Sequence, residues 1–456
     1  MKTFDVGAAL DDGQWGGYQK LLVLATALTI VLDGLDNQLL GVAIPSLMSE
    51  WNLTRPAFSI VLTLGLVGMA IGGAIGGFVG DRFGRRVALL GSVITFGVLT
   101  ICIYFVDNIA TLITLRFFAG LGLGGAMPNA AALSSEYVPK RHRPFAVTLT
   151  IVCVPLGGSL AGFVGGLILP VYSWRMLFLV GGILPLVLAA LLLKVLPESP
   201  RYLARRRERW PELRALLSRL GHGVSADAAF LDGTERTVSQ ASVGELFVPE
   251  LRRDTLALCA SFFCCLFTVY LGTNWIPSML ADSGVGFDRG TASYGLTAFN
   301  MGGVAGAILG AFVIMRLGSR SAMLMMAAGA AAGALVLSLM PIGPQAIVST
   351  FAMLAWTGGL MNGTQTTMYA LAAHVYPTSI RSTGVGTAVA FGRIGGVLSP
   401  SVGSWALESG GAPVYFRLLA GTMVATFAAL ASVRHHIPGA WSVRASGPVV
   451  AQPVRH

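Results

Sequence analysis

Long apolar stretches recur along the whole chain and are separated by short polar connections. About twenty mostly apolar residues are needed for one helix to cross a bilayer, and each stretch comes close to that length. The pattern therefore predicts an all-α polytopic membrane protein with twelve transmembrane helices. The predicted spans are residues 21–46, 57–79, 87–106, 110–135, 145–169, 174–195, 255–280, 291–315, 321–340, 345–373, 382–405 and 413–433.

One long polar interval divides the predicted spans into two sets of six. It mixes basic and apolar residues, a pattern typical of short helices lying at a membrane surface. The first twenty residues are too polar for a signal peptide. We therefore predict an N-terminal segment (1–20), an N-terminal half (21–195), a central loop (196–254), a C-terminal half (255–433) and a tail (434–456).

The two halves share an internal repeat. The stretch Gly77–Arg86 recurs in altered form as Ala311–Arg320, and Gly120–Arg143 recurs as Gly358–Arg381. Parallel repeats of this kind indicate two pseudo-symmetric six-helix halves. We expect the substrate site to lie between them.

The composition agrees with a chain that is mostly surrounded by lipid. Charged residues make up 11% and hydrophobic residues 54%, whereas soluble domains carry about 25% charged residues. The net charge of +10 arises in nucleic-acid binders and also from basic cytoplasmic loops. If the N-terminus is inside, most of the 31 Lys and Arg residues lie on that side. We therefore expect a multi-pass protein of the bacterial inner membrane, with both termini cytoplasmic and no nucleic-acid partner.

The sequence gives no indication of an enzyme. It contains no phosphate-binding loop and no nucleophile elbow. The five cysteines all fall within apolar runs, without metal-ligand spacing. We expect no metal, no cofactor and a protein that acts as a monomer.

Two carboxylates stand near the middle of the first predicted span. Asp33 and Asp36 are three residues apart and share one face of a helix. Each costs roughly 2.5–3.5 kcal/mol on insertion scales, so an accidental pair is disfavoured, although a satisfied structural pair stays open. Burial and a like-charged neighbour both favour the protonated form. This pair is therefore suited to exchange a proton.

The connection between spans 2 and 3 reads Gly80–Arg86 (GDRFGRR), in which glycines permit a tight turn. This stretch resembles the signature of the major facilitator superfamily. Together with the span count and the repeat, the resemblance covers essentially the whole chain. It implies two six-helix halves that rock around a central site, with a latch at the cytoplasmic gate. The latch residues are Asp81, Arg82, Arg85 and Arg86.

Further polar residues lie at the cytoplasmic ends of spans 4 and 10. Glu136 and Arg143 follow span 4, and Arg381 follows span 10 in the repeated pattern. We expect salt bridges between helices that close the inside gate, with direct substrate contact as the alternative. His374 titrates near neutral pH and is assigned to the gate, with a proton relay as a second possibility.

The tetrapeptide Asp33-Gly34-Leu35-Asp36 resembles the signature of the aromatic acid:proton symporter family. Members of that family import benzoates, hydroxybenzoates, protocatechuate and hydroxyphenylpropionates. The resemblance implies proton-coupled import of a small aromatic carboxylate, with Asp33 and Asp36 carrying the coupling. Arg116 in span 4 either pairs with one of these carboxylates and exchanges partners, or simply connects helices 1 and 4.

A candidate substrate pocket comes mainly from the C-terminal half. Arg393 in span 11 is the preferred anchor for a carboxylate, because a guanidinium binds carboxylates through two parallel hydrogen bonds. An internal salt bridge is the alternative. Spans 7 and 10 are rich in aromatic residues, which suit an aromatic ring. Tyr270, Asn274 and Gln365 are the preferred polar members.

Other transporter classes stay open at this point. Pro197–Arg201 (PESPR) also occurs in sugar and organic-ion transporters, but the Pro-Glu-Thr stretch of sugar porters is missing after span 12. Cys153–Gly158 matches the glycine-proline motif of drug antiporters only in part. The alternatives to an aromatic acid importer are therefore a proton-coupled transporter of another organic anion or a sugar, and a drug efflux antiporter.

Overall fold

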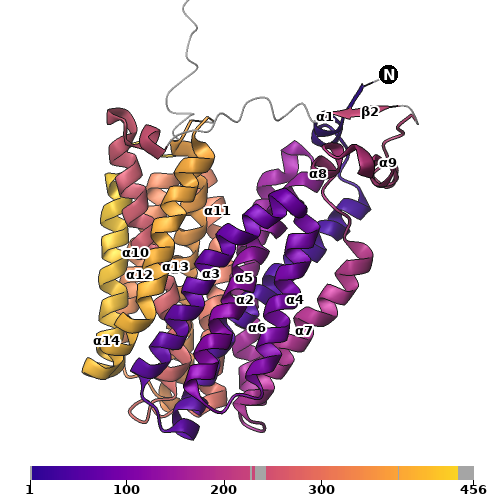
Figure 1. The fold of residues 1–456 in the computed structure, drawn as a ribbon. Helices are drawn as coiled ribbons and strands as arrows, with labels where there is room; N and C mark the ends of the chain where they lie inside the picture. Colours follow the sequence, from indigo (N-terminus) through magenta and orange to yellow (C-terminus); the bar gives the residue numbers. More distant parts are fainter. Residues whose placement is uncertain (1–2, 226–227, 232–242, 378, 440–456) are drawn as a thin grey trace, which may run out of the picture.

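The computed structural model describes residues 3–225, 228–231, 243–377 and 379–439. Within these residues the chain is dominated by long helices (Figure 1). They are α2 (Gly17–Trp51), α3 (Arg55–Phe83), α4 (Arg85–Ile103), α5 (Ile109–Tyr137), α6 (Arg143–Ile168), α7 (Trp174–Val195), α10 (Pro249–Leu280), α11 (Arg289–Leu317), α12 (Ser319–Leu339), α13 (Ile347–Val375) and α14 (Arg381–Ser432).

Every predicted span falls on one of these helices. The last two share α14, whose backbone leaves helical geometry at Gly410 and Gly411, so that α14 supplies two crossings. Ten helices among the described residues are long and apolar enough to cross a bilayer. The long helix α13 is more polar in its middle, where residues 362–367 read NGTQTT. The predicted all-α polytopic fold is confirmed.

Some helix boundaries differ from the prediction. The first long helix begins at Gly17, inside the predicted N-terminal segment, and α10 begins at Pro249, inside the predicted central loop. The first residues of both helices are polar and precede the apolar stretch of each helix. Hydropathy detects only that core, so it places the helix ends too far inward.

The two halves are built alike. In the N-terminal half α3 packs on α5 and α2 on α6, and in the C-terminal half α11 packs on α13 and α10 on α14. The halves meet where α6 contacts α11, α3 contacts α14 and α2 contacts α10. We call the end of the bundle at which α2 begins and α14 ends the termini side. The two halves diverge toward this side (Figure 1).

The repeat detected in the sequence corresponds to equivalent turns. Gly84 joins α3 to α4 with φ of 110°, and Gly318 joins α11 to α12 with φ of 82°. Residues with a side chain are strained at positive φ, so both turns favour glycine. The positive φ therefore explains why both repeated stretches have a glycine at this position.

Short elements gather on the termini side beside the N-terminal half (Figure 1). The helices α8 (Pro200–Ala204) and α9 (Trp210–Arg219) are the short surface helices expected in the central loop. The strands β1 (Thr3–Asp5) and β2 (Ala229–Leu231) form a parallel pair near α1 (Val6–Asp11), which the all-α prediction omitted.

The 3₁₀ turns among the described residues are η1 (Lys140–His142), η2 (Arg207–Arg209), η4 (Val243–Phe247) and η5 (Pro344–Ala346).

Four predicted segments fall partly outside the described residues: the N-terminal segment lacks residues 1–2 and the C-terminal half lacks residue 378. The central loop is described except for residues 226–227 and 232–242, and the tail is described as far as residue 439.

Candidate transport site

The paired carboxylates lie in the middle of α2 and are buried. Asp36 has no exposed surface and Asp33 is 7% exposed. The glycine between them faces α6, because a Cβ added to Gly34 would lie 2.4 Å from the carbonyl oxygen of Val154. The motif therefore combines a point of close helix packing with two carboxylates.

Asp36 forms a complete polar network within the N-terminal half. The Thr100 hydroxyl donates to Oδ1 at 2.6 Å, and Arg116 Nη1 donates to Oδ2 at 3.1 Å. Arg116 Nη2 also donates to the backbone oxygen of Asp36 at 3.2 Å. Of the two partners open to Arg116 in the sequence, the structure therefore selects Asp36. The hydroxyl of Thr100 gave no signal in the sequence, because threonines are common in membrane helices.

Asp33 differs from Asp36 in having an unsatisfied oxygen. Its Oδ1 is buried and has no hydrogen-bond partner among the described residues. The charged groups that influence this carboxyl are Asp36 and Arg393. Arg393 reaches across from α14 and donates from Nη1 to the Ala70 carbonyl of α3 at 3.4 Å. Gly73 makes room for it, because a Cβ there would lie 2.5 Å from Nη1.

An aromatic and amide cluster surrounds Arg393. The Tyr270 side chain is hydrogen-bonded to Asn37, and it interacts electrostatically with the Arg393 guanidinium. The Tyr369 side chain has the same charged neighbour and is hydrogen-bonded to Gln365. The structure therefore gathers two of the predicted binding residues, Tyr270 and Gln365, near the predicted anchor. It adds Asn37 and Tyr369, and Asn37 was recognisable as part of a polar run after Asp36.

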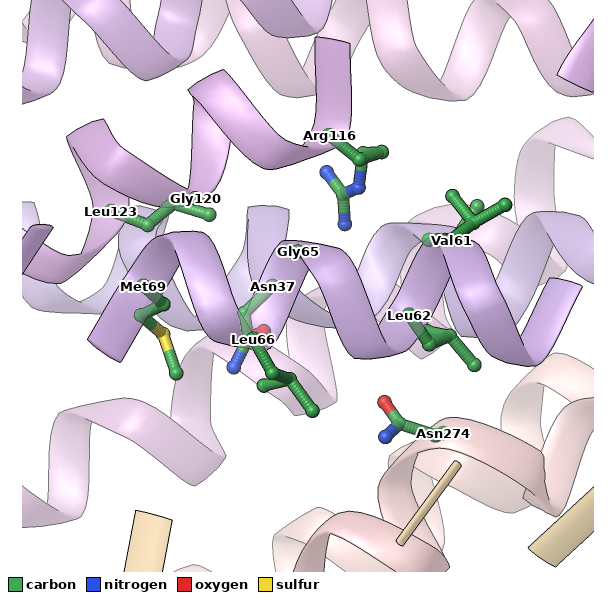
Figure 2. A pocket seen from close by; sticks show the side chains of 11 residues that line it. Asn37, Val61, Leu62, Gly65, Leu66, Met69, Arg116, Gly120, Leu123 and Asn274 are labelled. Atoms are coloured by element: carbon green, nitrogen blue, oxygen red, sulfur yellow. The ribbon is translucent and has the colours of Figure 1, made fainter. Parts of the chain in front are cut away.

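A small cavity lies next to this cluster, between α2, α3, α5 and α10 (Figure 2). Its volume is about 20 Å³, enough for about one water molecule. Asn274, the third predicted polar member, lines it, and its buried Nδ2 has no hydrogen-bond partner among the described residues. The cavity is lined by Asn37, Leu40, Val61, Leu62, Gly65, Leu66, Met69, Arg116, Gly120, Leu123 and Asn274.

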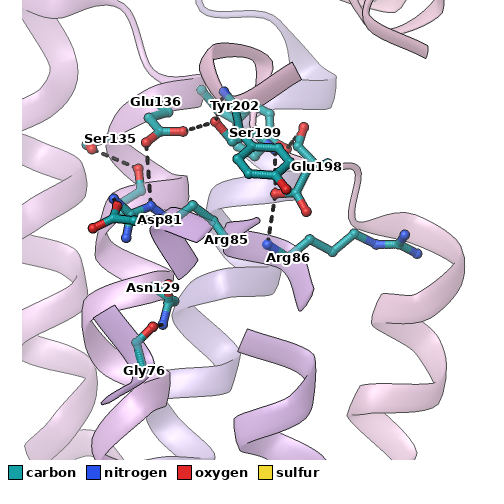
Figure 3. A network of polar contacts seen from close by, with 12 residues as sticks. Gly76, Asp81, Arg85, Arg86, Asn129, Ser135, Glu136, Glu198, Ser199 and Tyr202 are labelled. Carbon is teal, nitrogen blue, oxygen red and sulfur yellow. Dashed lines mark hydrogen bonds and ion pairs between the residues drawn. The ribbon is translucent and has the colours of Figure 1, made fainter. Parts of the chain in front are cut away.

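The predicted gate residues around the turn between α3 and α4 form a network inside the N-terminal half (Figure 3). Arg85 pairs with Asp81 at 2.5 Å and lies 4.0 Å from Glu136. Glu136 in turn accepts a hydrogen bond from the Ser199 hydroxyl. These contacts connect α3, α4 and α5 to the start of the central loop, and none of them reaches the C-terminal half.

The two remaining arginines of this turn also contact the central loop. The Arg86 amide donates to Glu198 Oε1 at 3.0 Å. The Arg82 side chain is exposed, while its carbonyl accepts a hydrogen bond from the Tyr202 hydroxyl at 3.3 Å. The turn is therefore clamped by the residues that follow α7, an attachment that the linear sequence does not show.

The other predicted gate residues are separated from one another. Arg143 pairs with Asp11 of α1 instead of Glu136. Arg381 donates from Nε to the Tyr376 carbonyl at 3.4 Å, within the C-terminal half. His374 is exposed near the end of α13. Neither of these contacts of Arg143 and Arg381 joins the N-terminal half to the C-terminal half among the described residues.

Polar bonds between the halves lie in the middle of the bundle and toward the side opposite the termini. Asn300 of α11 donates to Gln38 of α2 at 2.8 Å, and both are buried. Farther out, Arg55 at the start of α3 pairs with Asp282 after α10. This arrangement joins the halves away from the termini side and leaves the predicted gate residues apart.

Two six-helix halves around a buried site with ionisable residues define a secondary transporter that works by alternating access, and the fold is not that of an enzyme. Residues 26–400 and 262–448 match the Major Facilitator Superfamily. The chain belongs to this superfamily.

Three relatives illustrate the comparison with known proteins. The chain is 35% identical to a gallate transporter of Pseudomonas putida over 91% of this chain and 92% of that protein. It is 34% identical to the 4-hydroxybenzoate transporter PcaK of Pseudomonas aeruginosa, over 90% and 91%. It is 30% identical to a benzoate transport protein of Acinetobacter baylyi, over 89% and 87%.

Solved structures support the fold. A partially occluded inward-open structure of the xylose transporter XylE from E. coli matches with a TM-score of 0.70 and 18% identity, covering 91% of this chain and 97% of that one. An inward-facing bacterial homologue of the lysosomal transporter Spinster matches with a TM-score of 0.66 and 17% identity, covering 91% and 95%. At these identities the likeness concerns the fold alone.

Proposed function

We propose that the protein imports small aromatic carboxylates together with protons by alternating access. Relatives that are 30–35% identical to this chain are named for gallate, 4-hydroxybenzoate and benzoate. These compounds share a benzene ring with one carboxylate. The site offers the matching groups, namely the Arg393 guanidinium and the rings of Tyr270 and Tyr369.

The observation that carries the proposal is that the charge of Arg393 acts on the buried carboxyl of Asp33. The carboxyl belongs to α2 of the N-terminal half and the guanidinium to α14 of the C-terminal half. Asp33 has an oxygen without a donor, and a buried carboxylate that lacks partners is strongly disfavoured relative to its neutral form. Arg393 is the charge that opposes this tendency.

Coupling follows from competition for Arg393. When the carboxylate of a substrate binds the guanidinium, the positive charge is shared and Asp33 loses part of its stabilisation as an anion. Substrate binding therefore favours a proton on Asp33, and by reciprocity a proton on Asp33 favours substrate binding. Asp36 stays paired with Arg116 and holds α2 against α5. One anion and at least one proton then cross together.

We further propose that the termini side is cytoplasmic. It carries Lys140, Arg141, the basic start of the central loop and the turns at Gly84 and Gly318, as expected from the preference of Lys and Arg for the cytoplasmic side of inner-membrane proteins. On this assignment the structure faces inward. Asp81, Arg82, Arg85, Arg86, Glu136, Arg143, His374 and Arg381 would then approach one another when the cytoplasmic side closes.

A different organic anion is the second candidate substrate, since an arginine anchor binds any small carboxylate. The test is uptake of radiolabelled benzoate, 4-hydroxybenzoate, gallate, a dicarboxylate and xylose into cells expressing the protein. We expect the aromatic acids to accumulate and a protonophore to abolish this accumulation. Uptake of the dicarboxylate or the sugar alone would overturn the substrate assignment, and accumulation that survives the protonophore would overturn the coupling.

A further inference from the structure

We propose that the cavity lined by Asn37 and Asn274 is a subsite for a ring hydroxyl group, and that Asn274 makes the transporter prefer hydroxylated aromatic acids. This inference rests on the proposed function, because it concerns the far end of the ring whose carboxylate binds Arg393. In this proposal the site recognises a ring hydroxyl of the substrate in addition to its carboxylate.

The first observation is the unsatisfied amide of Asn274. The residue is 4% exposed, and its Nδ2 has no hydrogen-bond partner among the described residues. A buried amide without a hydrogen-bond partner costs free energy. A ligand that accepts a hydrogen bond from this amide removes that cost and binds more tightly for it. The backbone of α10 is fixed at this point by close packing, since a Cβ on Gly41 would lie 2.9 Å from the Asn274 carbonyl oxygen.

The second observation is the size and lining of the cavity. At about 20 Å³ it holds about one water molecule, and a hydroxyl oxygen needs similar room. Asn274 points toward it from α10, while Leu62, Leu66 and Met69 from α3 form an apolar wall (Figure 2). A ring hydroxyl in this cavity can accept a hydrogen bond from the amide, whereas an unsubstituted ring leaves the amide unpaired.

The third observation is the distance from the anchor. Arg393 contacts the Ala70 carbonyl, and Leu66 of the cavity wall lies four residues earlier in α3, about 6 Å along the axis. Asn37 lines the cavity and is also hydrogen-bonded to Tyr270 beside Arg393. The carboxylate anchor and the cavity are therefore neighbouring parts of one site.

Arg116 also lines the cavity but is already engaged. Two of its nitrogens donate to the side chain and backbone of Asp36. The amide of Asn274, in contrast, has free hydrogen-bonding capacity at this end of the site. A neutral hydroxyl suits it better than a second carboxylate, because an additional anion would compete with Asp36 for Arg116.

The experiment measures transport of benzoate, 3-hydroxybenzoate and 4-hydroxybenzoate by the full-length protein in proteoliposomes with an imposed pH gradient. The quantity compared is kcat/KM of each hydroxylated acid relative to benzoate. We expect Asn274→Leu to lower the ratio for at least one hydroxylated acid by about tenfold or more, whatever its effect on benzoate itself. The matched control is Asn362→Leu, a buried asparagine of α13 whose amide donates to the Gly358 carbonyl of its own helix, and it should leave the ratio unchanged.

Asn274→Ala is measured in parallel and replaces Asn274→Leu if the latter does not fold. Stabilisation of the purified protein against heat by each acid gives a second readout of the same preference. The inference is overturned if the ratios stay at the wild-type value, or if transport of all three acids falls together, as a purely structural role predicts. If the wild type transports none of the three acids while remaining folded, the proposed function itself fails.

Discussion

The pair of Asp36 and Arg116 provides a quantitative test of how the N-terminal half is held together. Side chains of the pair are 0% and 6% exposed, so neither charge is compensated by water. Arg116→Gln leaves the carboxylate with Thr100 as its remaining side-chain donor, and Asp36→Asn leaves the guanidinium without a countercharge. Removing one partner of a buried ion pair costs about 3–5 kcal/mol. We therefore expect each single variant to lose about that much of its unfolding free energy.

The double variant Asp36→Asn/Arg116→Gln should behave differently. It replaces two charges by two amides that are able to hydrogen-bond to each other, so no uncompensated charge stays buried. We expect it to be more stable than either single variant, with a coupling energy of at least about 2 kcal/mol. Thr100→Val, which removes one neutral donor, should cost only about 1–3 kcal/mol.

The assay is unfolding by SDS titration in mixed micelles, followed by circular dichroism of the wild type and the four variants. The reasoning is refuted if the losses of the two single variants simply add in the double variant, because additivity means that the two residues do not interact. Transport is expected to stay impaired in the double variant even where folding recovers, since it no longer carries the charges of the site.

Two further predictions concern contacts away from the ion pair. Burial alone would raise the pKa of Asp282, but the Gly284 amide and the Arg55 guanidinium hold this pKa below its ordinary value; the carboxylate thus favours closure at neutral pH, and this contribution should be lost as the pH on that side falls through the lowered pKa. Asp282→Asn should therefore raise the ratio of outward-open to inward-open molecules, measured by single-molecule FRET between the halves, by up to about fivefold. A ratio identical to that of the wild type at pH 7 would contradict this role of the Arg55–Asp282 pair. Gly34→Ala places a Cβ against the Val154 carbonyl and should lower the unfolding free energy by about 1–3 kcal/mol, whereas Gly77→Ala, with open space around its Cβ, should be neutral or slightly stabilising; equal effects of the two would refute the packing argument.

Much of the fold was predictable because lipid imposes simple constraints on sequence. Hydropathy located all spans, including the two that α14 combines, since Gly410 and Gly411 fall between the predicted ranges 382–405 and 413–433. The repeated turn was detectable because Gly84 and Gly318 both need a positive φ. The strand pair β1–β2 was missed, because three residues on each side, separated by the whole N-terminal half, leave no local pattern.

The candidate site was predictable where it depends on charge. Buried ionisable residues are rare in membrane helices, so Asp33, Asp36, Arg116 and Arg393 stood out. Which of them pair depends on how helices face one another, and the sequence left Arg116 with two possible partners. Asn37 was visible beside Asp36 but lacked a distinguishing charge.

Contacts that depend on the conformation were the least predictable. The gate residues were predicted from their motif, and the structure shows Arg143 bonded to Asp11 of α1 rather than to a residue of the C-terminal half. The sequence has to be compatible with every conformation of the transport cycle, whereas the structure shows one of them. The bond between Gln38 and Asn300 depends on this state in the same way.

The central claim is that Asp33 carries the proton that accompanies the substrate. The most direct test compares two activities of Asp33→Asn in proteoliposomes, namely accumulation of 4-hydroxybenzoate driven by a pH gradient and exchange of labelled for unlabelled 4-hydroxybenzoate without a gradient. Asparagine mimics the protonated carboxyl, so the account predicts that exchange persists while gradient-driven accumulation is lost. Accumulation at the wild-type level in Asp33→Asn would contradict it.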